Sequence, residues 1–333
     1  MVKYVIKRLL LAILILFGVS VILYTLVRLM PTNFIENQFY ATAGSGNADP
    51  ARLEQMLAYY GLEDDSFWGI IKGYFGWLGK FLTGDMGVSF KYQDKVQNVI
   101  FKNMGISFGI SFVSLILQLV IAIPLGIKCA VNQYGKLDYT VTFFTMVGIS
   151  FPTFFFANLL IKWLSVDLGW FPSGGLYSNI SYLKDTSDWI RFWDQMWHLI
   201  LPMFVLVILS VGSLVRYTRT NTLEVLNADY IRTARAKGLS ENKVIYKHVF
   251  RNTLIPLVTT LAGTLPGLFG GAMITETVFD LPGIGSIAYA AMREGDIPFI
   301  MGYNMFIAIL TVIGILLTDI MYSVVDPRVK LGK

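Results

Sequence analysis

Long apolar runs, separated by shorter polar segments, dominate the chain. Six of these runs reach the roughly 20 residues that an α-helix needs to cross about 30 Å of hydrocarbon. The six runs are Leu9–Leu29, Met104–Val131, Leu137–Leu164, Leu199–Val215, Thr253–Thr275 and Pro298–Ser323. The pattern therefore predicts an all-α polytopic membrane protein with six transmembrane helices.

Composition supports a location in the membrane. The chain has 333 residues, of which 55% are hydrophobic and 15% are charged, and its mean hydropathy is +0.59. Soluble proteins carry about 25% charged residues. Cys129 is the only cysteine, and His198 and His248 are the only histidines. An intrachain disulfide is therefore impossible, and we expect neither a metal site built from histidine and cysteine nor a bound cofactor.

The lysine and arginine residues predict the orientation. If both termini lie in the cytoplasm, most basic residues fall on the inner side, including the dense basic loop at 216–252. Most acidic residues then fall on the outer side. The positive-inside rule favours this arrangement, so we expect both termini in the cytoplasm and a location in the plasma (inner) membrane.

The first apolar run resembles a secretory signal peptide, because basic residues precede it and an Ala-Thr-Ala sequence follows at Ala41–Ala43. Secretory hydrophobic regions have about 7–15 residues, and Leu9–Leu29 is longer. We therefore predict an uncleaved first span.

We expect a single transmembrane domain over residues 1–333. Its parts are the first span (1–30), an external cap region (31–101), a five-span core (102–323) with the loop at 216–252, and a cytoplasmic tail (324–333).

The external region contains helix signals of its own. Pro50 stands at a first helical position after a possible N-cap, Asp49, and Gly61 is a stop signal. The segment Phe67–Gly84 is apolar enough to suggest a seventh span, which would reverse every later loop. It has 18 residues, with five glycines and two lysines. An aromatic helix lying in the outer membrane interface is therefore the favoured interpretation.

The loop between the fourth and fifth runs contains the stretch DYIRTARAKGLSENKVIYKHVF, Asp229–Phe250. We expect Asn227 or Asp229 to cap a helix there, and Gly238 stands where a left-handed residue ends one. A helix of about ten residues spans roughly 15 Å, which is too short to cross a membrane. Its small and apolar positions cluster on one side, which fits either a helix resting on anionic lipid or a helix docked on a cytoplasmic partner.

Further motifs accompany this stretch. They are YVIKRLLLAILILFGVSVI near the N-terminus, GLEDD…WLGKFLTGDMGVSF within Gly61–Phe90, FRNTLIPLV from Phe250, ETVFDLPGIG at Glu276–Gly285, and DPRV after the last run. In this order, and over essentially the whole chain, they resemble the permease subunits of ABC importers for dipeptides and oligopeptides.

The resemblance implies that the basic loop carries the EAA motif, a coupling helix that docks in a cleft of an ATPase subunit. Arg232 and Thr233 stand where the broad ABC-importer consensus has glutamate and alanine, a departure that the peptide branch shares. The coupling residues would be Asp229, Tyr230, Arg232, Thr233, Ala234, Arg235, Lys237 and Gly238.

The implied partners are a second homologous permease, two ATP-binding subunits, an extracytoplasmic substrate-binding protein and the lipid bilayer, without nucleic acid. The sequence has no G-x-x-x-x-G-K-[ST] motif, which would cradle a nucleotide phosphate. We therefore assign ATP hydrolysis to the partners and do not expect this chain to be an enzyme. The resemblance also implies that LPGIG lies near the outer mouth, where a binding protein delivers its cargo; a plain turn is the simpler interpretation.

Small residues recur every four positions in the fifth run, at Thr259, Gly263, Gly267, Gly271 and Thr275. They share one helix face, where missing side chains let another backbone approach closely. This face either packs within the chain or borders a second subunit or a substrate passage.

Asp319 is an ionisable residue within the last run. A proton relay is one interpretation of such a residue. Its position shortly before Asp326, near the inner surface, favours a structural role, with water or a basic partner within reach.

Peptide is the expected cargo. Importers of nickel chelates or glutathione in the same family are the alternative. A stand-alone secondary transporter is a weaker hypothesis, because it would bury more ionisable groups near the midplane. A membrane-embedded enzyme lacks any evident cluster of catalytic residues.

Overall fold

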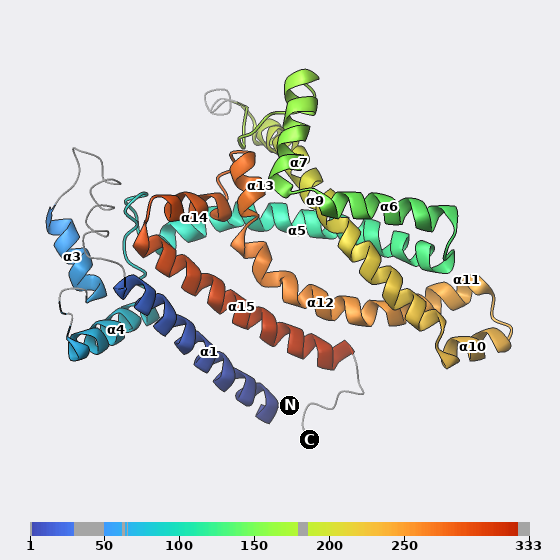
Figure 1. The fold of residues 1–333 in the computed structure, drawn as a ribbon, viewed down its shortest axis with the longest axis horizontal. Helices are drawn as coiled ribbons and strands as arrows, with labels where there is room; N and C mark the ends of the chain where they lie inside the picture. Colours follow the sequence, from blue (N-terminus) through green and yellow to red (C-terminus); the bar gives the residue numbers. More distant parts are fainter. Residues whose placement is uncertain (1, 30–49, 62–63, 65, 179–185, 326–333) are drawn as a thin grey trace.

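Helices make up the fold over the residues that the structure, a computed structural model, describes: 2–29, 50–61, 64, 66–178 and 186–325. Its long helices are α1 (Val2–Arg28), α5 (Val96–Val131), α9 (Asp188–Leu226), α12 (Phe250–Gly270) and α15 (Ile297–Val325). Short helices lie at the two ends of this bundle (Figure 1). At the end where α5 begins lie α3 (Pro50–Tyr60), α4 (Phe67–Leu82) and α14 (Ile284–Arg293), and at the other end lie α10 (Asp229–Ala236) and α11 (Glu241–Lys243).

Four helices within the described residues are long and apolar enough to cross a membrane: α1, α5, α9 and α15. A bent pair is a fifth candidate, formed by α6 (Lys136–Ser150) and by α7 (Thr153–Leu160) together with the π-helix η1 (Ile161–Asp167). These helices account for five of the six apolar runs, and they confirm the predicted all-α membrane class. The remaining run, Thr253–Thr275, corresponds to α12, which has 21 residues and two internal prolines.

The predicted third span, Leu137–Leu164, is not one straight helix. α6 and the α7–η1 segment meet at an angle of 101°. Pro152 explains the break, because the ring of a proline disfavours the helical backbone conformation of the residue before it. Phe151 is accordingly extended, with φ −81° and ψ 130°. The third apolar run is therefore a broken helix.

α9 is much longer than the fourth apolar run, with 39 residues that extend beyond Leu199–Val215 in both directions. Its second half packs tightly on α5. Gly126 makes this approach possible, because a Cβ atom there would lie 2.7 Å from the Cβ atom of Thr218. α9 therefore continues as a supported helix up to the loop that carries α10.

The helical region after α1 is tied to the bundle by an aromatic cluster. Trp77 of α4, which is 1% exposed, packs against Tyr24 of α1 and Met301 of α15. α4 has 16 residues, fewer than a membrane span needs, which favours the predicted cap over a seventh span. Pro50 begins α3, as predicted, and Gly61 follows its end with φ +63°. Asp49 lies outside the described residues.

The two helices nearest the chain ends are joined by an ion pair. Arg8 Nε of α1 lies 3.1 Å from Asp319 Oδ2 of α15. The structural interpretation of Asp319 expected water or a basic partner within reach, and Arg8 is such a basic partner. α15 also lies close to α12, because Gly314 leaves room for the ring of Pro266: a Cβ atom on Gly314 would lie 2.4 Å from the proline Cγ.

Candidate functional site

Residues 229–249, named the basic hairpin from here on, comprise α10, α11 and the π-helix η2 (Val244–Val249). The hairpin has a small apolar core. Ile231 and Ala234 are 0% and 7% exposed, and they pack with Val244 and Val249. Residues three apart lie on the same helix face, so α10 turns both side chains inward. The hairpin thus supports a helix that would be marginal by itself in water.

The outer face of the basic hairpin is polar and exposed. Tyr230, the largest side chain on this face, is 50% exposed. The other exposed members of the predicted coupling set are Asp229, Arg232, Thr233, Arg235, Lys237 and Gly238. Ala234 is the one member of that set that faces inward.

An ion pair closes the hairpin across its turn. Arg235 Nε donates to Glu241 Oε2 at 3.1 Å, and Arg235 Nη2 donates to Glu241 Oε1 at 2.6 Å. These hydrogen bonds lower the pKa of the Glu241 carboxyl below its ordinary value and raise the pKa of Arg235. The pair is bidentate, the geometry in which arginine and carboxylate recognise each other best.

The end of α10 was predicted correctly, but its N-cap was not. Neither Asn227 nor Asp229 is the N-cap: Ala228 occupies that position in an extended conformation, and Asn227 Nδ2 donates instead to the carbonyl of Leu223 at 3.0 Å. Asn227 therefore belongs to the end of α9. Gly238 has φ +78°, which confirms the left-handed stop, since only glycine adopts that region at little cost.

Buried polar contacts join the helices that lead into and out of the basic hairpin to one another and to α6. Arg219 of α9 grips Asp138 of α6 through two hydrogen bonds, Nε to Oδ1 at 2.7 Å and Nη2 to Oδ2 at 2.8 Å. Asp138 is 3% exposed. The hydroxyls of Thr222 in α9 and Thr253 in α12 lie 3.4 Å apart, both fully buried. α6, α9 and α12 thus meet beneath the hairpin.

The small residues predicted to share one helix face do not all lie on one helix, because α12 ends at Gly270, Gly271 follows with φ +79°, and Thr275 belongs to the next helix. Gly263 and Gly267 are exposed, and no atom of the described residues lies within 4 Å of the position that a Cβ atom would take on either. Gly271 differs, because a Cβ atom there would lie 2.6 Å from the nitrogen of Gly285. The first two glycines therefore face open space, whereas Gly271 packs within the chain.

Residues 271–286, named the outer loop from here on after the side of the membrane expected for them, contain α13 (Met273–Val278) and run into the first turn of α14. Its centre is the carboxylate of Glu276, which is 1% exposed. The carboxylate accepts hydrogen bonds from the backbone N–H of Ala272 at 2.9 Å and of Ser286 at 3.0 Å. A Cβ atom on Gly283 would lie 2.3 Å from Glu276 Oε2. The glycine of LPGIG therefore makes room for a buried carboxylate, and the segment is more than a plain turn.

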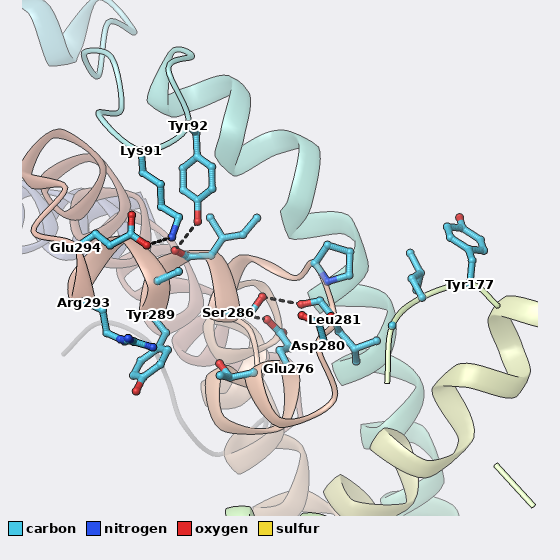
Figure 2. Close-up of a pocket in the computed structure, with 16 residues that line it drawn as sticks. Lys91, Tyr92, Tyr177, Glu276, Asp280, Leu281, Ser286, Tyr289, Arg293 and Glu294 are labelled. Atoms are coloured by element: carbon cyan, nitrogen blue, oxygen red, sulfur yellow. Dashed lines mark hydrogen bonds and ion pairs between the residues drawn. The ribbon is translucent and has the colours of Figure 1, made fainter. Parts of the chain in front are cut away.

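A pocket of 690 Å³ opens beside the outer loop (Figure 2). Its lining comes from the segment before α5, from residues 175–177, and from α13 and α14. The charged residues of the lining are Lys91, Glu276, Asp280, Arg293 and Glu294. Figure 2 shows Arg293 and Tyr289 at one end of the pocket, Tyr177 at the other, and Asp280 between them.

Two contacts give the pocket a fixed wall. Lys91 Nζ forms an ion pair with Glu294 Oε1. The hydroxyl of Tyr92 donates to the carbonyl of Ile287 at 3.2 Å. Burial raises the pKa of Tyr92 to about 12, with a smaller contribution from the Glu294 and Asp296 carboxylates. Tyr92 is therefore a neutral donor at physiological pH.

Sequence analysis did not identify the Asp138–Arg219 pair or the pocket. The two residues of the pair are 81 positions apart, and no local pattern connects them. Glu276 stands in the motif ETVFDLPGIG, and the two glycines that follow it there, Gly283 and Gly285, were a usable signal for a carboxylate enclosed by backbone.

Comparisons with known proteins place these features in context. Residues 122–331 match the family described as "Binding-protein-dependent transport system inner membrane component". The oligopeptide transport system permease protein AppB of Bacillus subtilis (strain 168) is 37% identical over 331 residues, covering 99% of this chain and 100% of that protein. The dipeptide transport system permease protein DppB of Escherichia coli (strain K12) is 31% identical, covering 99% of both.

A solved structure shares the fold. An inward-facing structure of the MetNI methionine ABC transporter contains a chain that is 20% identical, with a TM-score of 0.51, and the match covers 70% of this chain and 98% of that one. At this identity the likeness concerns the fold alone.

Proposed function

This chain belongs to the family of binding-protein-dependent transport system inner membrane components, and we propose that it forms half of the translocation pathway of an ATP-driven peptide importer. As a member of this family it is a multi-pass inner-membrane permease of an ABC importer, a class that works with partner subunits. Its coupling to ATPases, its cargo and its partner set are the proposal.

The observation that carries the proposal is the division of α10 into two faces. Ile231 and Ala234 are buried in the apolar core of the hairpin. The exposed face around Tyr230 and Arg232 is therefore not needed to hold the hairpin together. The basic hairpin is folded and has an exposed charged face, so it is suited to fit a cleft in a cytoplasmic ATPase. A helix lying on anionic lipid would instead turn its apolar face outward.

The contacts beneath the hairpin suggest how its movement reaches the membrane. Arg219 links α9 to Asp138 of α6, and Thr222 links α9 to α12. When two ATPases close, a hairpin held in their clefts moves, and these helices move with it as a rigid body. The nucleotide drives the change because it binds the closed and open states with different affinity.

We infer that α12 is the fifth of six crossings and that its open face borders a second, homologous permease. Gly263 and Gly267 leave this face bare of side chains, and small residues let helix backbones approach closely in membranes. Two ATP-binding subunits and an extracytoplasmic binding protein complete the proposed assembly.

Peptide is the proposed cargo because relatives that match over nearly the full chain are named as oligopeptide and dipeptide permeases. The same names favour peptide over nickel chelates or glutathione. The external placement of the outer loop near a binding protein is part of the same proposal.

Reversing one exposed charge on α10 tests the coupling. We expect Arg232→Glu, assayed in the complete complex in proteoliposomes, to lower peptide uptake on the order of tenfold, the effect of losing about 1.4 kcal/mol at the interface. Lys243→Glu is the matched control, because Lys243 is also an exposed basic residue of the hairpin. It should keep uptake and ATP hydrolysis near the wild-type values. Equal behaviour of the two variants would contradict docking through α10.

A further inference from the structure

The pocket beside the outer loop is lined by two charged side chains of opposite sign that form no ion pair within the described residues. Lys91 and Glu294 neutralise each other, and Glu276 is occupied by two backbone N–H groups. Asp280 and Arg293 also line the pocket, are exposed, and form no ion pair within the described residues. Asp280 has φ +50°, a strained conformation for a residue other than glycine, and such strain clusters at ligand sites.

The length of α14 sets the size of a peptide that can lie along it. Arg293 is the last residue of α14, and Asp280 precedes its first residue, Ile284. A helix of ten residues is about 15 Å long. An extended peptide covers about 3.3–3.6 Å per residue, so a peptide that lies along the length of α14 has four or five residues.

We propose that the pocket is a peptide subsite, in which Arg293 binds the terminal carboxylate and Asp280 binds the terminal ammonium of an oligopeptide lying along α14. Arginine suits the first role because its guanidinium pairs with a carboxylate through two parallel hydrogen bonds. Every unmodified peptide carries both terminal charges, so this recognition does not depend on peptide sequence. The proposal rests on the proposed function for its cargo class.

The side walls of the pocket fit the same ligand. Tyr177 and Tyr289 are 41% and 39% exposed, and tyrosine rings offer apolar faces to varied side chains together with a hydroxyl for hydrogen bonding. Tyr92, whose hydroxyl donates to the carbonyl of Ile287, also lines the pocket. The side chains of a protein partner can present the same two charges, so the experiment below is done without binding protein.

Photo-cross-linking with modified peptides tests the subsite. The probe is the tetrapeptide Ala-Ala-Bpa-Ala, where Bpa is p-benzoylphenylalanine, prepared with free termini, with a C-terminal amide or with an N-acetyl group. It is titrated onto the full-length permease in its complex in nanodiscs, without binding protein. We expect amidation or acetylation to raise the half-saturating concentration about tenfold, the size of effect from one lost charge-assisted hydrogen bond. The free dipeptide Ala-Bpa should also bind more weakly.

Two variants assign the ends. In Arg293→Gln the amidated and free probes should label equally, while acetylation still weakens labelling; in Asp280→Asn the reverse should hold. Lys102→Gln, which changes an exposed residue of α5 away from the pocket lining, should discriminate as the wild type does. Labelling that ignores the termini, a uniform loss in both variants, or labelling only when binding protein is present would overturn the subsite.

Uptake separates this inference from the proposed function. If cells import the free tetrapeptide only when the permease is present, but labelling ignores the termini, the subsite alone is wrong. If deletion of the permease leaves tetrapeptide uptake unchanged, the proposed cargo is wrong, and the subsite is rejected with it.

Discussion

The basic hairpin and the outer loop are short segments of similar make-up that bury opposite kinds of side chain. The hairpin lies between α9 and α12 and the outer loop between α12 and α14, and each contains a glycine with positive φ, Gly238 with φ +78° and Gly271 with φ +79°. The hairpin encloses an apolar side chain, Ile231, and turns its charges outward. The outer loop encloses a carboxylate, Glu276, and wraps its backbone around it.

This difference indicates where each region can bind something else. In the hairpin, the polar groups of the outer face contribute little to folding, so they are available to a partner. In the outer loop, the carboxylate of Glu276 already accepts hydrogen bonds from the backbone. Only charges at the edge of the loop, such as that of Asp280, remain for a ligand. Buried polar groups that are fully hydrogen-bonded rigidify a structure, and they are costly to disrupt.

The largest effect is expected at the centre of the outer loop. Glu276→Ala removes the acceptor of two partly buried N–H groups, those of Ala272 and Ser286, and an unsatisfied buried donor costs about 1–3 kcal/mol. The apparent melting temperature of the purified complex should fall, and the outer loop should become sensitive to protease. Thr277→Ala, a change at the adjacent exposed residue, should leave both unchanged. Equal protease sensitivity in the two variants would contradict the central role of Glu276.

A second pair of variants separates folding from docking in the basic hairpin. Ile231→Ala removes a fully buried side chain, which costs about 2 kcal/mol or more. Limited proteolysis of inside-out vesicles should therefore cleave the hairpin, and uptake should fall. Tyr230→Ala should leave the hairpin resistant to protease while uptake still falls. If Tyr230→Ala opens the hairpin as readily as Ile231→Ala, the two faces do not differ as described.

The open glycines of α12 should affect assembly and spare the fold of this chain. Gly267→Leu places a side chain where no described atom lies within 4 Å. We expect unchanged insertion of the chain but about tenfold less complex with the second permease, measured by co-purification, if about 1.4 kcal/mol is lost at the interface. Gly18→Leu on α1 is the control, since that position is also open. Normal complex yield in Gly267→Leu would show that this face does not border the second permease.

The smallest effect is expected at the ion pair of the hairpin. Exposed pairs contribute well under 1 kcal/mol in most cases. Since Arg235 lowers the pKa of Glu241 in the folded hairpin, its stabilisation is present above the ordinary carboxyl pKa and is lost as the pH falls through the lowered value. Protease resistance should therefore be flat between about pH 6 and 8 and should decline only in acid. Glu241→Gln should remove the acid-dependent part, and a decline between pH 6 and 8 would exclude Glu241 as its source.

The sequence predicted most of the long elements, because apolar length alone identifies a helix that can cross a membrane. It did not predict the 101° break at Phe151, although Pro152 was the signal. It also placed the cap of α10 on Asn227 or Asp229, because side-chain preference did not reveal that α9 runs on to Leu226.

The candidate site was predicted only where its residues are close in sequence. The proposed coupling residues lie within ten positions, and the structure brings them into one hairpin. That Ala234 faces inward depends on packing against Val244 and Val249, which sequence spacing does not specify. The Asp138–Arg219 pair and the charges around the pocket come from distant segments, so they emerge only from the fold.

Cross-linking from the outer face of α10 tests the central claim most directly. Arg232→Cys introduces an accessible thiol, while the native cysteine, Cys129, is buried. With a short bifunctional reagent in membranes containing the whole importer, the account predicts a product that joins this chain to an ATP-binding subunit and disappears when the thiol is placed at Lys243. Labelling of that cysteine by a membrane-impermeant maleimide in intact cells would contradict the account, because it would place the hairpin outside.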